Sequence, residues 1–355
     1  MGKPSHSLPA PPVAFFEELE GRFGEAAAAR GVAERDVSVA GAPLRLCFAG
    51  EELLEAIYPS FAHLGESRAG AAAEIAVFEG ARSGVEAPAV PEVEAASASE
   101  AANPIVRYQG DDVAILAEPN TGLVTAGRGD GSRTLLYVPD PAEIPAPDWV
   151  GRFRGPLMLA LMPRGLRLLH AGAVGLGGRG VLVSGRSGSG KTTLCIACAL
   201  AGMEICADDY VVLGAGDPPI VHALQSTASV SEESARMLGL ERGGATGFEA
   251  VLGDLPKARF DLAEIAGGLV PRLEPAALIV PLRSGRSEPE LRRVSAARGL
   301  QSLAPSTVFQ QPPRDDGLLS AMAHLVSRLR CFELELSADV AANAAAVREA
   351  VDGLA

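Results

Sequence analysis

The chain has 355 residues, 48% of them apolar and 21% charged, which is the composition of an ordinary globular protein long enough for two domains. Its formal net charge of −13 argues against a nucleic-acid partner and against attraction to a membrane, because both need a basic surface. The sequence has no apolar run of bilayer-spanning length and no signal-peptide core, so a cytoplasmic location is expected.

The first 147 residues predict a small α+β domain with an accessory or partner-binding role, because they contain no catalytic constellation. Helices are expected from Phe15 to Ala33 and from Glu51 to Leu64. A mobile loop is expected at about residues 80–104, which lack periodicity, and a Pro-rich linker at residues 139–147. Alternating apolar residues predict strands at Leu44–Phe48, Ala73–Phe78, Ile105–Tyr108, Val113–Ala117, Gly122–Ala126 and Thr134–Val138.

Residues 148–355 predict an α/β domain that carries the chemistry. Its core is expected to begin with a hairpin, followed by a glycine-rich loop, a helix and two more strands. An Ala-rich amphipathic helix is expected near the end of the chain, from Asp339 to Leu354. The predicted core elements are strands Leu168–Val174 and Gly180–Ser184, helix Thr193–Leu200, and strands Glu204–Ala207 and Val211–Leu213.

The glycine-rich loop Gly185-Arg186-Ser187-Gly188-Ser189-Gly190-Lys191-Thr192 is a complete P-loop pattern. Its glycines let successive backbone N–H groups point at a phosphate, Lys191 reaches the β- and γ-phosphates, and the Thr192 hydroxyl is a ligand for Mg2+. Only two other lysines, Lys3 and Lys257, occur among the 31 basic residues, and a compact ammonium suits a site between phosphate oxygens. We therefore predict ATP and Mg2+ as cofactors, with nucleotide contacts from Gly185, Ser187, Gly188, Ser189, Gly190, Lys191, Thr192 and Thr193.

A pair of carboxylates, Asp208 and Asp209, follows the strand that comes directly after the predicted P-loop helix. This is the place for the second ligand of a phosphate site, since one carboxylate can hold Mg2+ and the other can take a proton from an attacking hydroxyl. The alternative is a solvated turn. The P-loop before the pair and the strand after it favour the functional interpretation.

The five cysteines are an odd number in a chain without secretory context, so structural disulfides are not expected. Cys195 and Cys198 form a CxxC pair, but no second pair of metal ligands lies nearby in the sequence. We interpret both as small, buried apolar residues on one helix face.

Taken together, the motifs His170–Val174, Gly180–Thr192 and Ala207–Asp209 resemble the catalytic core of HPr serine kinase/phosphorylase and its relatives. Those relatives are kinases with a compact P-loop fold related to ATP-dependent phosphoenolpyruvate carboxykinase. The resemblance covers residues 165–213. It implies an α/β fold, with a P-loop kinase domain of this type preceded by a small α+β accessory domain.

The resemblance implies ATP- and Mg2+-dependent transfer of the γ-phosphoryl group to a hydroxyl, usually that of serine, on a protein or peptide acceptor. It implies that Asp208 is the catalytic base, that Asp209 is the acidic group beside the metal, and that His170 lies near the pair. A hydrogen-bonded core histidine is the alternative for His170. Residues 224–244 lack the Arg-Gly-rich signature of true HPr kinases, so the chain resembles the diverged relatives more than the bifunctional enzyme. The resemblance also favours a homo-oligomer.

Three further groups are weaker candidates. Lys257 lies in a basic segment that could close over the γ-phosphate or simply be solvated. His222 and Gln225 could line an acceptor pocket. A cluster of arginines is interpreted as a solvated face, and it comprises Arg283, Arg286, Arg292, Arg293 and Arg298.

Two other functions stay open beside a protein or peptide kinase. One is a kinase for a small-molecule hydroxyl acceptor, and the other is a nucleotide-dependent regulatory NTPase whose first domain binds a partner. Hydrolysis of ATP without an acceptor, stimulated by a partner, would indicate the regulator. The sequence does not identify the phosphate acceptor or the preferred nucleotide base, and it does not show whether a reverse phosphorylase reaction exists.

Overall fold

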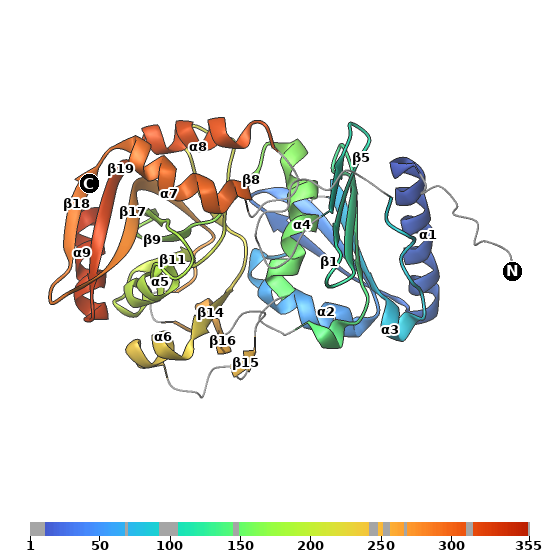
Figure 1. The fold of residues 1–355 in the computed structure, drawn as a ribbon, viewed down its shortest axis with the longest axis horizontal. Coiled ribbons are helices and arrows are strands. Elements are labelled where there is room, and N and C mark those ends of the chain that lie inside the picture. Colours follow the sequence, from blue (N-terminus) through green and yellow to red (C-terminus); the bar gives the residue numbers. More distant parts are fainter. Residues whose placement is uncertain are drawn as a thin grey trace, which may run out of the picture.

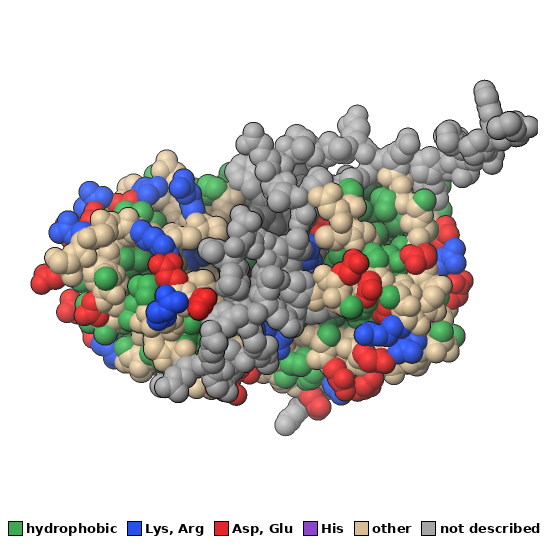
Figure 2. Space-filling model, turned by 60° about the horizontal axis from the view of Figure 1, so that its bottom comes forward, with side chains coloured by type: hydrophobic (Ala, Val, Ile, Leu, Met, Phe, Trp, Pro, Cys, Tyr) green, Lys and Arg blue, Asp and Glu red, His purple; other side chains and the backbone are tan. Residues whose placement is uncertain are grey.

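The structure is a computed structural model that describes residues 11–67, 70–91, 106–144, 149–240, 248–250, 256–265, 268–309 and 315–353. The fold is mixed α/β, and the described strands form three sheets, of which the two larger ones contain both parallel and antiparallel pairs (Figure 1). None of the described helices combines the length and the apolar character needed to cross a membrane. Basic and acidic side chains are interspersed on the face drawn in Figure 2.

The first sheet contains seven of the described strands in the order β1-β2-β3-β7-β6-β5-β4. Strands β2, β3 and β7 are parallel neighbours, and the other pairs are antiparallel. The six predicted strands are confirmed as β2 to β7. The bounds are β1 Val32–Val39, β2 Ala42–Ala49, β3 Ala73–Glu79, β4 Val106–Gln109, β5 Val113–Glu118, β6 Leu123–Arg128 and β7 Arg133–Val138.

Strand β1 is a correction to the sequence analysis, which extended the first helix to Ala33. Helix α1 (Pro12–Arg30) ends because Gly31 has a φ of 77°, a value that glycine adopts readily. The chain then forms β1 and pairs with β2 through a tight turn at Ala40 and Gly41, both with positive φ. The charged residues within β1 obscure its alternating pattern in the sequence.

Helices cover both faces of the first sheet (Figure 1). Helix α1 packs four aromatic and aliphatic side chains, Phe15, Phe16, Leu19 and Phe23, on one face. Helix α2 (Glu51–Ile57) and helix α4 (Trp149–Leu161) pack on the other face. Short helical turns complete this half, at η1 Tyr58–Ser60, η2 Ala62–Leu64, α3 Gly80–Ser83 and η3 Pro141–Glu143. Within the predicted loop, residues 80–83 are therefore helical, while residues 92–104 lie outside the described part of the chain.

Helix α4 begins directly after the predicted domain boundary at residue 148, yet its apolar face belongs to the core of the first sheet. Phe153 is fully buried and lies 5.3 Å from the ring of Phe61, measured between centroids. The same cluster of buried residues includes Tyr210 and Leu224 from the second half of the chain. Helix α4 therefore joins the two halves through a shared apolar core.

The second sheet contains nine described strands, of which seven follow the order β11-β9-β10-β17-β13-β12-β8. The long strand β17 is parallel to both β10 and β19, and β18 pairs with β19. The bounds are β8 Arg167–Leu169, β9 Gly172–Leu176, β10 Arg179–Val183, β11 Glu204–Ala207, β12 Val211–Leu213, β13 Val221–Ala223, β17 Arg272–Arg286, β18 Glu290–Val294 and β19 Arg330–Ser337.

Two layers of helices enclose this sheet (Figure 1). Helices α5 (Lys191–Leu200) and α9 (Val340–Asp352) pack on one face, and α7 (Ala296–Phe309) and α8 (Leu318–Ser327) pack on the other. The predicted helices after the P-loop and near the end of the chain are thus confirmed. The remaining elements are η5 Met162–Arg164, α6 Glu232–Met237, η7 Leu262–Glu264, and a small sheet of β14 Thr227–Ser231, β15 Phe248–Ala250 and β16 Pro256–Asp261. All five cysteines are buried and free, including Cys195 and Cys198.

The predicted strand Leu168–Val174 is wrong, because the chain forms two strands with a break between them. Strand β8 pairs with β12, whereas β9 pairs with β10 and β11. The chain crosses between these two parts of the sheet at His170 and Ala171. Gly172 explains the close crossing, since a Cβ atom there would lie 2.4 Å from Cys195 Sγ.

Candidate functional site

The P-loop joins the end of β10 to the start of α5, and its path depends on glycine at three positions. Gly188 and Gly190 have φ values of 76° and 101°, which other residues rarely adopt. A Cβ atom on Gly185 would lie 2.7 Å from Ser189 Oγ. The chain therefore curls around the amino end of α5, where backbone N–H groups and the helix dipole favour an anion.

Lys191, the first residue of α5, folds back across this loop. Its Nζ atom donates a hydrogen bond to the Gly185 carbonyl at 2.8 Å, and the residue is only 7% exposed. The ammonium group is thus held inside the curve of the loop, which is the position that the P-loop pattern predicts for contact with phosphates. The predicted phosphate contact Thr193 points elsewhere, because its hydroxyl donates to Ser234 Oγ on α6 at 2.8 Å.

The two carboxylates lie at a second crossing of the chain, between β11 and β12. In the strand pair β12–β8, Val211 is opposite Leu169. In the strand pair β11–β9, Ala207 is opposite Ala173, so the same antiparallel alignment continues on both sides of the crossing. Residues 208–210 therefore run antiparallel beside residues 170–172. This pairing brings the Asp pair and His170 together, although they are far apart in the sequence.

Asp209 and His170 form a close polar contact at this crossing. The Nε2 atom of His170 lies 2.7 Å from Asp209 Oδ1. The backbone N–H of His170 donates to Thr307 Oγ1 on α7 at 3.1 Å, and the imidazole is 93% buried. The Asp209 side chain is 42% exposed, so solvent reaches this side of the pair.

Asp208 has a different environment, because it is 2% exposed and faces the P-loop. The Thr192 hydroxyl lies next to its carboxyl group and favours the ionised form. The Oδ1 atom of Asp208 is buried and has no hydrogen-bond partner within the described structure. A buried oxygen without a partner is unfavourable unless a ligand or cation contacts it.

Burial raises the pKa of Asp208 to about 8, and the adjacent charge of Asp209 adds to the rise. The Thr192 hydroxyl acts in the opposite direction, but its effect is weaker. Burial also opposes ionisation of Asp209, but the hydrogen bond from His170 and the charges of His170 and Arg154 lower the pKa of that carboxyl. Near neutral pH, the pair therefore carries one negative charge, which resides on Asp209.

Two residues of this site were missed in the sequence analysis. The ring of Tyr210 stacks on His170 with the centroids 4.8 Å apart and the planes at 10°. The guanidinium carbon of Arg154 lies 4.5 Å from the centre of the Tyr210 ring. Tyr210 directly follows the Asp pair and was a visible candidate. Arg154 carries no sequence signal, because it reaches the site only through the packing of α4.

The weaker candidates lie away from the Asp pair or outside the described side chains. His222 lies on β13 with its ring against Gly214, and the side chain of Lys257 is outside the described part. Gln225 donates to the Thr227 carbonyl at 2.9 Å. Three of the clustered arginines form ion pairs with glutamates, namely Arg286 with Glu290 and Arg292 and Arg298 with Glu333.

A cleft of about 420 Å3 lies beside the P-loop on the side of α7. The loop residues Gly185 to Ser189 form one wall, and the end of β17 and one face of α7 form the others. Arg283 lines this cleft and also a second cavity next to α5. The P-loop is thus accessible from two sides.

The residues present fit a Mg2+ ion, although no set of three or more His, Cys, Asp and Glu residues with the geometry of a protein-only metal site occurs among the described residues. The fit rests on the unpartnered Oδ1 of Asp208 beside the hydroxyl of Thr192. Mg2+ is commonly held by one or two protein oxygens, with substrate phosphates and water as its other ligands. Two adjacent oxygen ligands are therefore sufficient for a nucleotide-bound ion.

Comparison with known proteins adds little to this geometry. No protein-family model matches the chain, and no curated protein matches it. Among solved structures, the Hpr(Ser) kinase/phosphatase from Coxiella burnetii is similar, with 13% sequence identity and a TM-score of 0.28. The match covers 53% of this chain and 99% of that chain. These values support at most a distant relation, and they show no function.

The raised pKa of Asp208 predicts an unusual dependence of stability on pH. The folded protein retains a proton that the unfolded chain loses near pH 3.8, so the free energy of unfolding falls as the pH rises from about 4 to 8. We expect Asp208→Asn, which resembles the protonated acid, to gain stability relative to the wild type over this window by a few kcal/mol. Urea unfolding in the presence of a chelator, at several pH values, measures the difference.

The control for this prediction is Asp112→Asn, which changes an exposed carboxylate in the turn between β4 and β5. Its stability curve is expected to stay parallel to that of the wild type. A difference between Asp208→Asn and the wild type that does not change with pH would contradict the raised pKa.

Proposed function

We propose that the chain is an ATP- and Mg2+-dependent phosphotransferase that moves the γ-phosphoryl group to a hydroxyl of a protein or peptide acceptor, with serine as the expected acceptor residue. The observation that carries this proposal is the crossing at which Asp208 contacts Thr192 of the P-loop while Asp209 contacts His170. One carboxyl group thus faces the phosphate-binding loop, and its neighbour faces solvent.

The contacts support roles for the two carboxylates that are the reverse of those implied by the family resemblance. Asp208 is buried beside Thr192 and lacks a partner for Oδ1, so we assign it to Mg2+ together with Thr192. Asp209 is the exposed and ionised member of the pair, so an incoming hydroxyl can reach it. We assign Asp209 as the general base.

In the proposed reaction, the acceptor hydroxyl gives its proton to the free oxygen of Asp209 as its own oxygen attacks the γ-phosphorus in line. The bond between the γ-phosphorus and the bridging oxygen breaks, and ADP leaves with that oxygen. His170 holds the other carboxylate oxygen, and because Asp209 is ionised, the proton of this hydrogen bond belongs to Nε2.

Charge on the phosphates is neutralised by groups that the fold holds in place. The Lys191 ammonium and the N–H groups of the P-loop surround the expected phosphate position. Mg2+ bound at Asp208 and Thr192 would offset the charge on the β- and γ-phosphates. Because phosphoryl transfer needs little covalent chemistry from the protein, positioning and charge stabilisation supply most of the catalysis.

A nucleotide-dependent regulatory NTPase is the second candidate, and two contacts favour it. Helix α4 packs on the first sheet and carries Arg154 to the ring of Tyr210, next to the Asp pair. In addition, the backbone N–H of Ser226 donates to the Ser60 carbonyl at 2.9 Å. A partner bound to the first half of the chain would therefore have a direct physical route to the site.

The two functions are separated by following the γ-phosphate of labelled ATP. The purified protein is incubated with Mg-ATP and with three sets of acceptors: a serine-peptide library, a fraction of soluble proteins and a pool of small hydroxyl compounds. Mass spectrometry locates the phosphate. Label on a peptide or protein supports the proposal, label on a small molecule indicates a small-molecule kinase, and release only as inorganic phosphate indicates an NTPase.

A further inference from the structure

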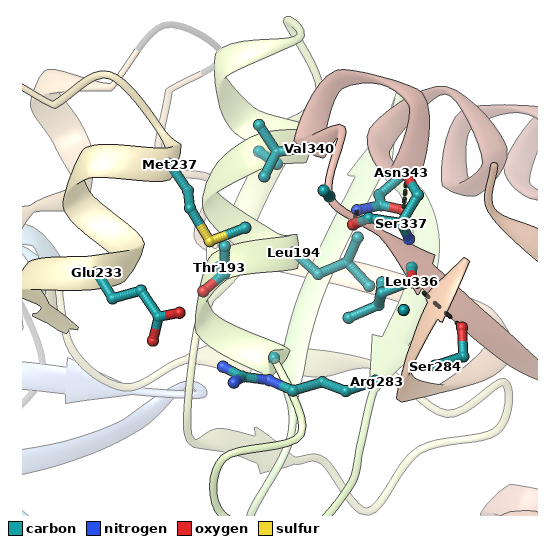
Figure 3. A pocket seen from close by; sticks show the side chains of 14 residues that line it. Thr193, Leu194, Glu233, Met237, Arg283, Ser284, Leu336, Ser337, Val340 and Asn343 are labelled. Carbon is teal, nitrogen blue, oxygen red and sulfur yellow. Dashed lines mark hydrogen bonds between the residues drawn. The ribbon is translucent and has the colours of Figure 1, made fainter. Parts of the chain in front are cut away.

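A cavity of about 330 Å3 opens beside the first turn of α5, on the face of the sheet that α9 covers (Figure 3). It begins at the last P-loop glycine, Gly190, and neither Asp208 nor Asp209 lines it. Its apolar walls come from four elements, with Leu194 on α5, Met237 on α6, Leu336 on β19 and Val340 on α9. Its volume lies within the range of small-molecule pockets, roughly 300–1,000 Å3.

The uncharged polar side chains that line this cavity are occupied within the protein. The hydroxyl of Thr193 donates to Ser234 at 2.8 Å, and the hydroxyl of Ser284 donates to a β19 carbonyl at 3.3 Å. Asn343 accepts from the Ser337 N–H at 2.9 Å and donates to the Ser337 carbonyl at 3.0 Å. Each of these groups is therefore held in a fixed orientation by a bond within the protein.

The two charged residues that line the cavity, Glu233 and Arg283, have exposed side chains. Figure 3 shows them pointing toward one another below Thr193, at the end of the cavity that is near the P-loop. Neither forms an ion pair with another described residue. The charged side chains therefore lie at the end of the cavity near the P-loop, and the walls farther from the P-loop are apolar.

We propose that this cavity receives the base and ribose of a nucleoside triphosphate, and that it discriminates only weakly between adenine and guanine. This inference rests on the proposed function, which places the phosphates in the P-loop. A ring held by apolar walls gains its binding free energy from buried area and dispersion, which differ little between the two purines. Strong discrimination needs polar groups that are left unpaired by the wrong ligand, and the uncharged ones here are already paired.

The test compares three ligands by calorimetry in excess Mg2+: the non-hydrolysable imido analogues of ATP and GTP, and inorganic tripolyphosphate. The wild type is expected to bind both analogues at least tenfold more tightly than tripolyphosphate, and to bind them within tenfold of one another. Met237→Asn removes an apolar wall that is 42% exposed, and it should weaken both analogues about fivefold. Its affinity for tripolyphosphate should not change.

Two further variants make the test robust. Val340→Phe fills the cavity from α9 and should weaken the analogues in the same selective way. Leu319→Asn serves as the control, because Leu319 is also an exposed apolar residue, 54% exposed, but lies on α8 away from the cavity lining. It should change the affinity for none of the three ligands.

Three results would overturn the inference. If the analogues bind no more tightly than tripolyphosphate, or if neither cavity variant weakens them, the base lies elsewhere. If one analogue binds more than 100-fold more tightly than the other, the site reads the base and the weak discrimination is wrong. If the wild type binds none of the three ligands, the proposed function itself fails, and the nucleoside cavity fails with it.

Discussion

Replacing Asp209 by Asn is expected to lower the rate of phosphoryl transfer by on the order of 100-fold or more, which is the usual scale of general-base catalysis. The amide keeps the shape of the side chain and a hydrogen-bond acceptor for His170 Nε2, but it cannot take a proton from the acceptor hydroxyl. The affinity for Mg-ATP should change little. Single-turnover transfer to an acceptor peptide, measured beside nucleotide binding, separates the two effects.

Asp208→Asn is the companion variant, because it should mainly raise the Mg2+ concentration needed for half-maximal activity. Its carboxyl group faces Thr192 and would lose its proton on binding Mg2+, and a carboxylate is a better ligand for a hard cation than an amide. Asp112→Asn, on the first sheet, controls for the loss of one negative charge. If the two substitutions exchange their effects, Asp208 is the base, as the family resemblance implies. If neither changes transfer or the Mg2+ requirement, the pair is structural.

The P-loop and its neighbouring elements were predictable because their signals are local. Glycines at fixed spacing, an apolar run before them and a helix-forming run after them define β10, the loop and α5 within a short stretch of chain. Lys191 was also identified, although its burial was not expected from a loop position. Local pattern thus predicts which residues bind phosphate, and only packing shows how firmly Lys191 is held.

The contact between His170 and Asp209 depends on strand register, which is not a local property. The segment Leu168–Val174 is predicted as a single strand, but the structure divides it between β8 and β9. The break at His170 is opposite the break at the Asp pair because β8 pairs with β12 and β9 pairs with β11. Without the pairing partners, the sequence could place His170 near the pair only through a resemblance.

The place of Arg154 was still less accessible from the sequence. It depends on the packing of α4. The sequence of this helix alone does not show whether its apolar residues belong to the core of the first or the second half of the chain. Phe153 packs against Phe61 of the first half, and this packing directs Arg154 to Tyr210 in the second half. The role of α4 is therefore decided by the shape of the shared core and not by its own periodicity.

Replacing Lys191 by Met is expected to remove most of the affinity for Mg-ATP while leaving the fold intact. The methionine side chain can occupy the buried path of the lysine stem, but it supplies neither positive charge nor a hydrogen-bond donor inside the loop. The loss of the bond to the Gly185 carbonyl should cost about 1 kcal/mol of stability, because hydrogen bonds contribute about that much on average. Binding of the ATP analogue and thermal unfolding measure the two expectations separately.

The matched control is Arg179→Met, which removes an exposed cation at the opposite end of β10 and should leave nucleotide affinity unchanged. A folded Lys191→Met protein that binds the analogue as tightly as the wild type would show that the phosphates do not lie in the P-loop.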